Sequence, residues 1–408
     1  MIPKVKTKKV KLEEYSKTPF FNEVKKLSKK LSKARIVHMN SAKEGGGVAE
    51  ILKSLVPLMN SAGLKAEWIL IPEDKKFFEQ TKSLHNSLQG KKTNFSKKEY
   101  LKHLEKTAKK MKGLNADFWV LHDPQPAGLV DFFKFNSPVI SRIHIDSSDP
   151  DPVAWDFIKD FVSRSDRIIF SAEEFAGKGF PPEKTRFFAP AIDPFSLKNK
   201  KISLEYAKKI IKKFKINVSR PLTIQVSRFD PAKDPLGVIK AYKIAKKEVK
   251  GLQLALLGLI MAEDDPEARI MLNEIEKERE GDKDIFVFSN PAVLNGISND
   301  IFVNAFQTGS DIVLQKSLKE GFGLTVAEAM WKEKAVIGGN AGGIRLQIKN
   351  GENGFLADSP EEAAFLIKKL IQNAELKERI GRKAKKSVSN RFLILRLLRD
   401  YLKMFSEI

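Results

Sequence analysis

The chain has 408 residues, of which 42% are hydrophobic, so it can bury a large core and is long enough for two or three domains. It has no cysteine, which excludes disulfides, thiolate metal sites and cysteine nucleophiles and fits a reducing compartment. Its net charge of +22 suits an anionic partner such as a nucleic acid, a membrane surface or a diphosphate.

The positive charge also has a plainer interpretation. The lysines are scattered, and neither a helix-turn-helix pattern nor an aromatic-interleaved RNA motif accompanies them. We therefore favour a solvated, lysine-rich surface of the heat-adapted kind over a nucleic-acid-binding surface. No apolar run approaches the roughly 20 residues that span a bilayer, and no hydrophobic signal core follows Met1. We expect no membrane partner and a cytoplasmic location.

Two α/β halves follow one another along the chain. Apolar strand-like runs alternate with helical periodicity, as at 48–60 and 100–112 in the first half. The strand-like runs are 34–38, 66–71, 118–121, 138–143 and 167–170 in the first half, and 222–226, 252–257, 285–288, 311–314 and 335–337 in the second. Such alternation predicts parallel, doubly wound sheets, which bind ligands at the carboxyl ends of their strands.

The halves join near residues 188–194, where two prolines interrupt the pattern. We predict a domain at 1–194, a second at 195–391, and an amphipathic helix within 392–408 that packs back on the first domain or on the second. The predicted fold class is α/β, with two Rossmann-like domains facing across a cleft in the GT-B architecture. A periplasmic-binding-protein-like architecture is the alternative, and the missing signal segment counts against it.

Glycines and histidines follow strands of the first half. The triplet at 45–47, which includes Gly46 and Gly47, precedes a helix and lets the backbone approach a ligand, although many such triplets are only flexible turns. His122 and His144 lie at the carboxyl ends of the runs 118–121 and 138–143, each with an aspartate nearby. A catalytic pair is favoured over two structural histidines, and no metal site is expected because a third ligand is not apparent.

Two cations follow the first strand of the second half. Arg228 and Lys233 lie in the loop between this strand and the next helix, where they can hold a diphosphate and neutralise it as it leaves. Two basic residues in a surface turn are equally probable when this loop is considered alone. The segment described next makes the functional interpretation the better one.

The segment 316–328 is the most informative part of the chain. Glu320 and Glu328 lie on either side of a glycine-bracketed turn, which follows an apolar run and precedes helical spacing. A helix that starts in this way presents free N–H groups and its positive dipole end to a phosphate. The residues of this predicted phosphate loop are Gly321, Phe322, Gly323, Leu324 and Thr325. A site that holds a diphosphate between two carboxylates suits a ligand with a hydroxyl-rich group on each side of its diphosphate. The segment therefore predicts a nucleotide-sugar.

Taken together, these residues resemble the retaining GT-B glycosyltransferases of glycosyltransferase family 4. The E-x7-E motif of that family corresponds to Glu320 and Glu328, its basic pair to Arg228 and Lys233, and its glycine loop to residues 45–47. Within the family, the closest resemblance is to the trehalose glycosyltransferring synthases. The segments that carry it are 40–50, 121–126, 142–146, 315–323 and 328–332, and trehalose phosphorylases share much of this pattern.

The resemblance implies a role for each matched residue. Arg228, Lys233 and the N–H groups of 323–325 would hold the donor diphosphate, Glu328 the ribose and Glu320 the hydroxyls of the donor glucose. In the first domain, His144 would line the reaction centre. The residues implied for the acceptor are Asp123 and Gln125, which would bind glucose, and Gly46 and Gly47, which would close over it.

The implied reaction moves glucose, with retention and reversibly, from an NDP-glucose to free glucose and forms α,α-trehalose. No metal or other cofactor is expected to be required, with Mg²⁺ at most a stimulant in solution, and a homodimer is expected. The alternatives are a trehalose phosphorylase, a different glucosyltransferase of the family, a sugar-binding module without turnover, and a basic nucleic-acid-binding protein.

Overall fold

The computed structural model describes residues 2–177, 179–259 and 266–408, which form two compact units. Unit 1 comprises Met1–Ala191 together with Ile394–Ile408, and unit 2 comprises Ile192–Leu393. Each unit is built on a six-stranded sheet, and the predicted pair of doubly wound α/β sheets is confirmed. No helix within the described ranges is long and apolar enough to cross a membrane.

The sheet of unit 1 has the strand order β2-β1-β3-β4-β5-β6, and its pairings are parallel. Its strands are β1 (Arg35–Asn40), β2 (Lys65–Leu70), β3 (Phe118–His122), β4 (Val139–Arg142), β5 (Arg167–Phe170) and β6 (Thr185–Phe187). The order reverses between β1 and β3. Loops that leave these two strands therefore diverge, and such a point is where open α/β sheets bind ligands.

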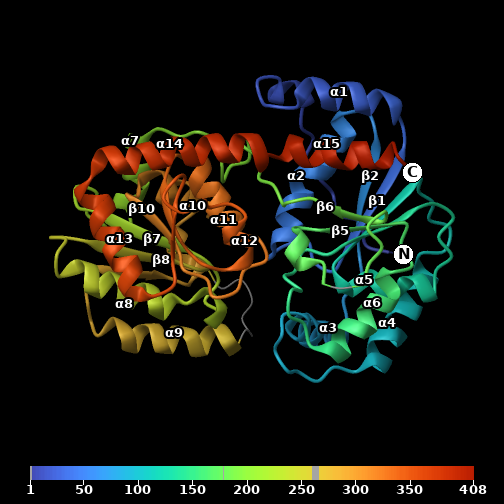
Figure 1. Ribbon diagram of the computed structural model, residues 1–408, viewed down its shortest axis with the longest axis horizontal. Helices are drawn as coiled ribbons and strands as arrows, with labels where there is room; N and C mark the ends of the chain where they lie inside the picture. The colour runs from blue at the N-terminus through green and yellow to red at the C-terminus, as the bar shows by residue number, and fades with distance from the viewer. Residues whose placement is uncertain (1, 178, 260–265) are drawn as a thin grey trace. The chain divides into compact units, whose positions relative to one another are not determined.

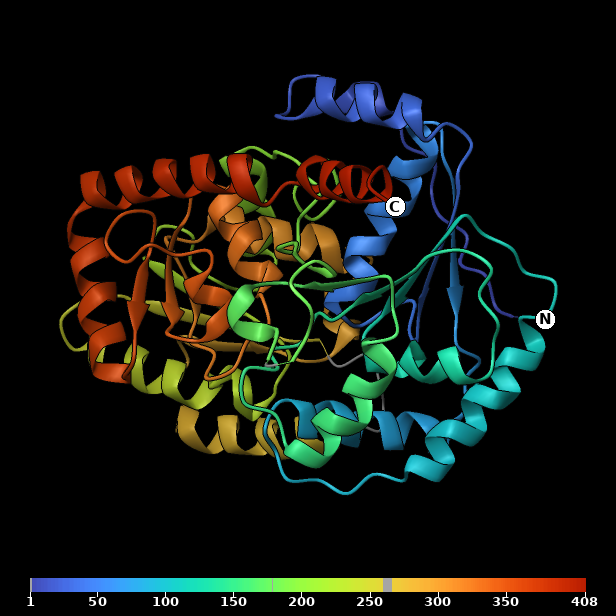
Figure 2. The ribbon, with the colours of Figure 1, turned by 45° about the vertical axis from the view of Figure 1, so that its right-hand side comes forward.

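Helices cover both faces of this sheet (Figure 1). The helices on one face are α1 (Phe21–Lys30), α2 (Gly47–Ser61) and α15 (Ile394–Phe405), and those on the other are α3 (Lys75–Leu88), α4 (Lys97–Lys110), α5 (Pro124–Ala127) and α6 (Pro152–Val162). The first and last helices of the chain lie side by side (Figure 2). There the Arg399 guanidinium stacks 4.2 Å from the Phe20 ring, and Lys403 pairs with Glu23 at 2.6 Å.

The sheet of unit 2 has the order β12-β11-β10-β7-β8-β9, again with parallel pairings. Its strands are β7 (Leu222–Val226), β8 (Gln253–Leu257), β9 (Ile285–Phe288), β10 (Ile312–Gln315), β11 (Ala335–Gly339) and β12 (Phe355–Ala357). This is the Rossmann order, in which the direction of winding reverses between β7 and β10. The central strands are buried on both faces, which explains why they are mostly apolar without a strict alternation of apolar and polar residues.

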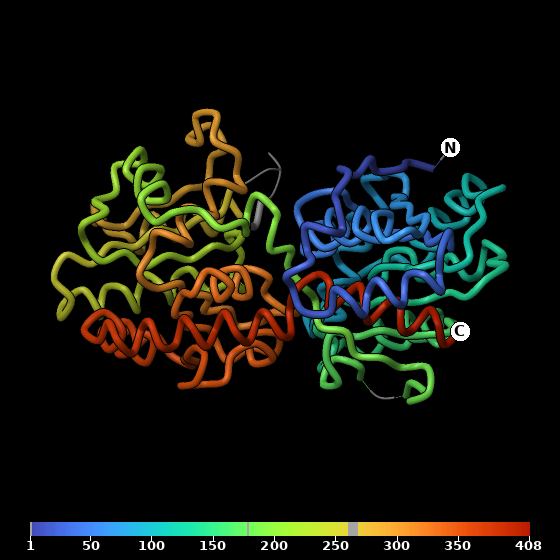
Figure 3. The backbone as a smooth tube through the Cα atoms, turned by 90° about the horizontal axis from the view of Figure 1, so that it is seen from above, coloured from blue at the N-terminus to red at the C-terminus, as the bar shows by residue number. Residues whose placement is uncertain are grey.

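The helices of unit 2 also form two layers. Those on one face are α8 (Pro235–Lys246), α9 (Pro266–Arg279) and α13 (Pro360–Gln372), and those on the other are α7 (Leu204–Lys212), α10 (Asn299–Gly309), α11 (Leu324–Trp331) and α14 (Ala374–Arg391). A short helix, α12 (Gly342–Arg345), follows β11. Figure 3 shows α14, in red, beside the orange part of the chain that contains α11, with which it packs.

The strands β6 and β12 were not predicted from the sequence. Each has three residues and lies at the edge of its sheet, so each is too short to show an apolar period. The last helix begins at Ile394, two residues later than the predicted segment, because Phe392 and Leu393 belong to unit 2. Phe392 packs against Phe322 with ring centroids 5.3 Å apart.

A buried arginine ties α15 into unit 1. Arg396 is 6% exposed and donates to the backbone carbonyls of Ala189 and Pro190, at 2.5 and 3.0 Å. It also pairs with Asp400 one turn along the helix, at 2.8 Å. Because both carbonyls are acceptors in a poorly solvated position, loss of their donor leaves them unsatisfied.

We expect Arg396→Met to lower the free energy of unfolding by about 2–4 kcal/mol, since it leaves these acceptors without a partner. The matched control is Arg382→Met, which removes an exposed ion pair on α14 and should cost less than about 1 kcal/mol. Denaturant unfolding of the two variants measures the difference. Equal losses would show that Arg396 does not anchor the helix.

Candidate functional site

The loops that follow β7 and β10 meet at the switch point of unit 2. The loop after β7 carries Arg228 and Lys233 and ends in the short helix Pro231–Lys233, and the loop after β10 carries Glu320. They are joined through the backbone, where the N–H of Leu318 donates to the carbonyl of Ala232 at 2.8 Å. Rossmann sheets bind nucleotides at this position, so the topology brings the sequence-predicted residues of unit 2 to one place.

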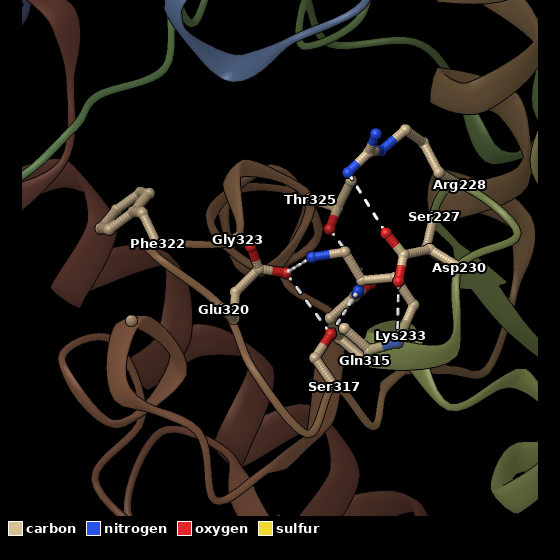
Figure 4. A network of polar contacts seen from close by, with 12 residues as sticks. Ser227, Arg228, Asp230, Lys233, Gln315, Ser317, Glu320, Phe322, Gly323 and Thr325 are labelled. Carbon is tan, nitrogen blue, oxygen red and sulfur yellow. Dashed lines mark hydrogen bonds and ion pairs between the residues drawn. The ribbon is translucent and has the colours of Figure 1, made fainter. Parts of the chain in front are cut away.

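Lys233 and Glu320 form the centre of this site (Figure 4). The ammonium of Lys233 donates to Glu320 Oε2 at 2.8 Å, and the two side chains are only 15% and 13% exposed. Ser317 Oγ lies 3.4 Å from the same carboxylate oxygen. The backbone of Lys233 is also fixed, because its carbonyl accepts from Gln225 Nε2 at 3.0 Å. The pair is therefore held in place on both sides.

The second predicted cation, Arg228, lies differently. Its side chain is 69% exposed, and its nearest ionic partner is Asp230, at 3.4 Å. Asp230 is itself committed to the N-cap of the short helix, where it accepts from the N–H of Ala232 at 2.8 Å. Figure 4 shows the Arg228 guanidinium joined by a dashed line to Asp230, with no such line to Lys233 or Glu320. It is a solvated cation on a flexible stem, whereas Lys233 is a fixed one.

Helix α11 begins beside this pair without a side-chain cap. Gly323 is its N-cap and has φ +81°, a left-handed conformation that favours glycine. Among the described residues, none accepts a hydrogen bond from the backbone N–H of Leu324 or Thr325. Thr325 Oγ1 donates to Gln315 Oε1 at 3.1 Å. The helix start thus presents unsatisfied donors and the positive end of its dipole.

The turn before α11 is held by close backbone packing rather than by its aromatic side chain. Phe322 is 5% exposed and packs into the core against Phe392, so only its backbone is available to a ligand. Gly343 donates its N–H to the carbonyl of Glu320 at 2.8 Å, and a Cβ there would lie 2.3 Å from Phe322 Cα.

Glu328 lies on α11 with a carboxylate that is nearly buried. Its exposure is 4%, Lys198 Nζ lies 4.0 Å from Oε1, and Oε2 has no hydrogen-bond partner in the described structure. One turn along, Lys332 donates to Asn199 Oδ1 at 3.0 Å and to Gln307 Oε1 at 2.9 Å. Burial lowers the pKa of Lys332 to about 7. A buried acceptor without a partner marks a place for a donor from a ligand.

The switch point of unit 1 gathers the other predicted residues. His122 ends β3 and Asp123 follows it, His144 follows β4, and the glycine loop follows β1. Asp123 Oδ1 accepts from the backbone N–H of His144 at 2.7 Å. Asp123 has φ 64° and ψ −179°, a strained conformation for any residue other than glycine. Backbone strain of this kind persists only where the surrounding structure fixes it, and here it accompanies a fixed direction of the Asp123 side chain.

The electrostatic setting of Asp123 is unusual. Burial raises the pKa of Asp123 to about 6, and the hydrogen bond from His144 and the charge of Arg142 oppose that rise. Arg142 is 1% exposed and donates to the carbonyls of Phe170, at 2.9 Å, and Phe188. Burial lowers the pKa of Arg142 to about 10. The carboxylate therefore sits beside a buried cation that is committed to the backbone.

The remaining predicted residues of unit 1 are less constrained. Gly46 has no atom within 4 Å of where a Cβ would stand, and Gly47 begins α2. Gln125 is partly buried in α5. Asp146, noted beside His144, accepts from Ser148 Oγ at 2.6 Å in a local turn. Within the described part of the chain, no three histidine, aspartate or glutamate side chains could hold a metal ion.

One further histidine joins the predicted pair. His38 in β1 lies with its Nδ1 3.0 Å from His122 Nε2, and His122 Nδ1 lies 2.9 Å from His144 Nε2. Sequence reasoning did not single out His38, although it is the last residue of the predicted run 34–38; in the structure β1 continues past it to Asn40. The signal that could have found it is a histidine at the end of a predicted strand, the same signal that singled out His122 and His144.

Comparison with known proteins gives a family for both units. The model "Trehalose synthase, N-terminal domain" matches residues 38–177, and "Glycosyl transferases group 1" matches residues 207–387. The trehalose synthase of Thermococcus litoralis is 41% identical over 94% of this chain and 93% of that protein. The trehalose synthase of Rubrobacter xylanophilus is 40% identical over 95% and 94%. The trehalose phosphorylase of Grifola frondosa is 27% identical over 86% of this chain and 54% of that protein.

Solved structures agree on the fold. The sucrose-phosphate synthase of Thermosynechococcus elongatus has a TM-score of 0.70 at 14% identity, covering 92% of this chain and 98% of that one. The α,α-trehalose-phosphate synthase (UDP-forming) of Burkholderia xenovorans has a TM-score of 0.72 at 10% identity, covering 91% and 100%. Such low identities carry the architecture alone, whereas the trehalose synthases match at high identity over nearly the whole chain. The chain therefore belongs to the trehalose synthase family of GT-B glycosyltransferases.

Proposed function

We propose that the protein moves glucose, with retention and reversibly, from an NDP-glucose to free glucose and forms α,α-trehalose. The observation that carries the proposal is the Lys233–Glu320 pair, 2.8 Å apart beside the uncapped start of α11. A fixed cation and free N–H groups suit a diphosphate, and a carboxylate next to them suits the hydroxyls of a sugar attached to it. The trehalose synthases among its relatives support the choice of product.

In the proposed complex, unit 2 holds the donor. Lys233, Arg228 and the N–H groups of residues 323–325 bind the diphosphate, and each charge-assisted hydrogen bond contributes about 1.5–3 kcal/mol. Glu320 accepts from hydroxyls of the donor glucose. Glu328 takes the ribose, whose hydroxyl would give the unpartnered Oε2 its missing donor. Gly321, Phe322, Leu324 and Thr325 contribute through the backbone.

In unit 1, Asp123 and Gln125 bind the acceptor glucose, Gly46 and Gly47 close over it, and His144 lines the reaction centre. Bond breaking places excess negative charge on the departing diphosphate, which Lys233, Arg228 and the helix start stabilise. The acceptor hydroxyl attacks from the same side, and an oxygen of the leaving phosphate takes its proton. Because the cations supply the positive charge, we propose that no metal cofactor is required and that Mg²⁺ only stimulates.

We expect the protein to release NDP and form a disaccharide when it is incubated with free glucose and one nucleotide-sugar. UDP-glucose, ADP-glucose and GDP-glucose are tested in separate reactions. Nuclear magnetic resonance of the product should show a single glycosidic bond that joins two anomeric carbons, both in the α configuration, as in α,α-trehalose. Omitting glucose tests for simple hydrolysis of the donor. A disaccharide with another linkage, or sugar bound with no NDP released, would contradict the proposal.

A trehalose phosphorylase is the second candidate, supported by the relative in Grifola frondosa. It requires no nucleotide and splits trehalose with inorganic phosphate. Incubation with trehalose and phosphate alone separates the two activities, because only a phosphorylase would release glucose 1-phosphate under those conditions.

Removal of either member of the central pair should stop transfer while the fold persists. We expect Lys233→Ala and Glu320→Ala each to lower kcat at least about 100-fold, since each removes a preorganised contact to the reacting donor. Lys240→Ala, an exposed lysine on α8 of the same unit, is the matched control and should retain full activity. Wild-type rates in a folded Lys233 or Glu320 variant would count against the site.

The raised pKa of Asp123, about 6, predicts a pH dependence. Only the carboxylate accepts hydrogen bonds at both oxygens, so kcat/KM for glucose should fall as the pH drops through about 6. Unfolded aspartate has a pKa of about 4, so the wild type should lose stability as the pH rises from about 4 to about 6. Asp123→Asn should lack both changes, which kinetics and thermal unfolding across this range would measure. An identical stability profile in the variant would refute the assignment.

A further inference from the structure

Three histidines of unit 1 form a line across its sheet. His38 lies within β1, His122 ends β3 and His144 follows β4, and these three strands are neighbours. His38 is in register with Val120, two residues before His122, and His122 is in register with Arg142, two residues before His144. Side chains alternate along a strand with a period of two, so this diagonal spacing places the rings on one face.

The rings are joined by two hydrogen bonds. His38 Nδ1 lies 3.0 Å from His122 Nε2, and His122 Nδ1 lies 2.9 Å from His144 Nε2. A neutral imidazole has one N–H donor and one lone-pair acceptor. Each contact joins an Nδ1 of one ring to an Nε2 of the next, and only one of these two nitrogens can carry the hydrogen. If all three rings are neutral, both contacts are hydrogen bonds only when all three rings are protonated on Nδ1, or all three on Nε2.

The surroundings keep the rings neutral. Burial lowers the pKa of His38 to about 3, and burial with nearby positive charge lowers the pKa of His122 and His144 well below the usual value. Part of that charge belongs to Arg142, which is buried beside them. The line is therefore a series of neutral donors and acceptors at physiological pH.

The far end of the line sets its direction. His38 Nε2 lies 3.3 Å from Met59 Sδ, on α2. A thioether sulfur accepts weakly and has no hydrogen to donate, so this contact is favourable only when His38 Nε2 carries the proton. His38 Nδ1 is then an acceptor, His122 donates to it from Nε2, and His144 donates to His122 from Nε2. No described residue hydrogen-bonds the remaining nitrogen, His144 Nδ1.

We propose that His38 and His122 are positioning residues which, with Met59, hold His144 in the Nε2-protonated form and leave its Nδ1 as a fixed hydrogen-bond acceptor. This rests on the proposed function, in which His144 lines the reaction centre. The group that such a nitrogen recognises is a sugar hydroxyl that donates its hydrogen. Without the line, the ring of His144 could exchange its donor for an acceptor and lose that selectivity.

The tautomers can be read directly in the unliganded protein. With ¹⁵N-labelled histidine at about pH 7.5, His144 should show an unprotonated Nδ1 and a protonated Nε2. Couplings across the hydrogen bonds should link His144 Nε2 to His122 Nδ1, and His122 Nε2 to His38 Nδ1. A proton on His144 Nδ1, or missing couplings, would overturn the proposal. This result is independent of turnover, whereas absence of transfer by the wild type would contradict the proposed function instead.

Two substitutions of His122 separate positioning from mere packing. His122→Leu cannot accept from His144, so His144 should become a mixture of tautomers and kcat/KM for NDP-glucose should fall about tenfold, the value of one hydrogen bond. His122→Gln offers both an N–H donor and a carbonyl acceptor and should restore much of the rate and the tautomer. His85→Gln, on α3 outside the line, is the control. Equal losses in the Leu and Gln variants with an unchanged His144 tautomer would refute the role.

Discussion

The ion pair between Lys233 and Glu320 is the interaction on which the site of unit 2 depends. Both side chains are largely withdrawn from water, so each is costly to bury alone and strongly stabilised by the other. The pair also connects loops that are 87 residues apart in the sequence. Since the Leu318–Ala232 backbone hydrogen bond joins the same two loops, the pair is one part of a rigid frame. A ligand that enters this frame meets charges that need little rearrangement.

The predicted site of unit 1 differs, because it contains a strained backbone and buried charged groups. Asp123 keeps an unfavourable backbone conformation and a carboxylate that burial destabilises, and the buried Arg142 interacts with it electrostatically. Such arrangements lower stability by a few kcal/mol and persist only where the surrounding structure fixes them. The hydrogen bonds of Arg142 to two carbonyls, and of Asp123 to the N–H of His144, provide that fixation.

Much of the fold and part of the site follow from sequence. The runs predicted at 222–226 and 285–288 match β7 and β9 residue for residue, because both are rich in β-branched and other apolar residues and are bounded by polar or turn residues. Lys233, Glu320 and Gly323 could be singled out because strand ends and glycine turns are local signals in the sequence. Lys233 and Arg228 lie in the same loop, so the sequence could not show that Lys233 pairs with Glu320 whereas Arg228 pairs with Asp230. His38 was not singled out because its importance lies in contacts with distant segments.

The chain leaves unit 1 at Ala191 and returns to it only at Ile394. The returning helix supplies Tyr401, whose ring lies 5.9 Å from that of His38 and 5.6 Å from that of Phe188. During synthesis, therefore, the ribosome releases every residue of unit 2 before unit 1 has its last helix. Unit 2 can mature on the nascent chain, while the first 191 residues must wait with an apolar face uncovered until α15 has been made. That interval is when the protein is most open to aggregation and to chaperones.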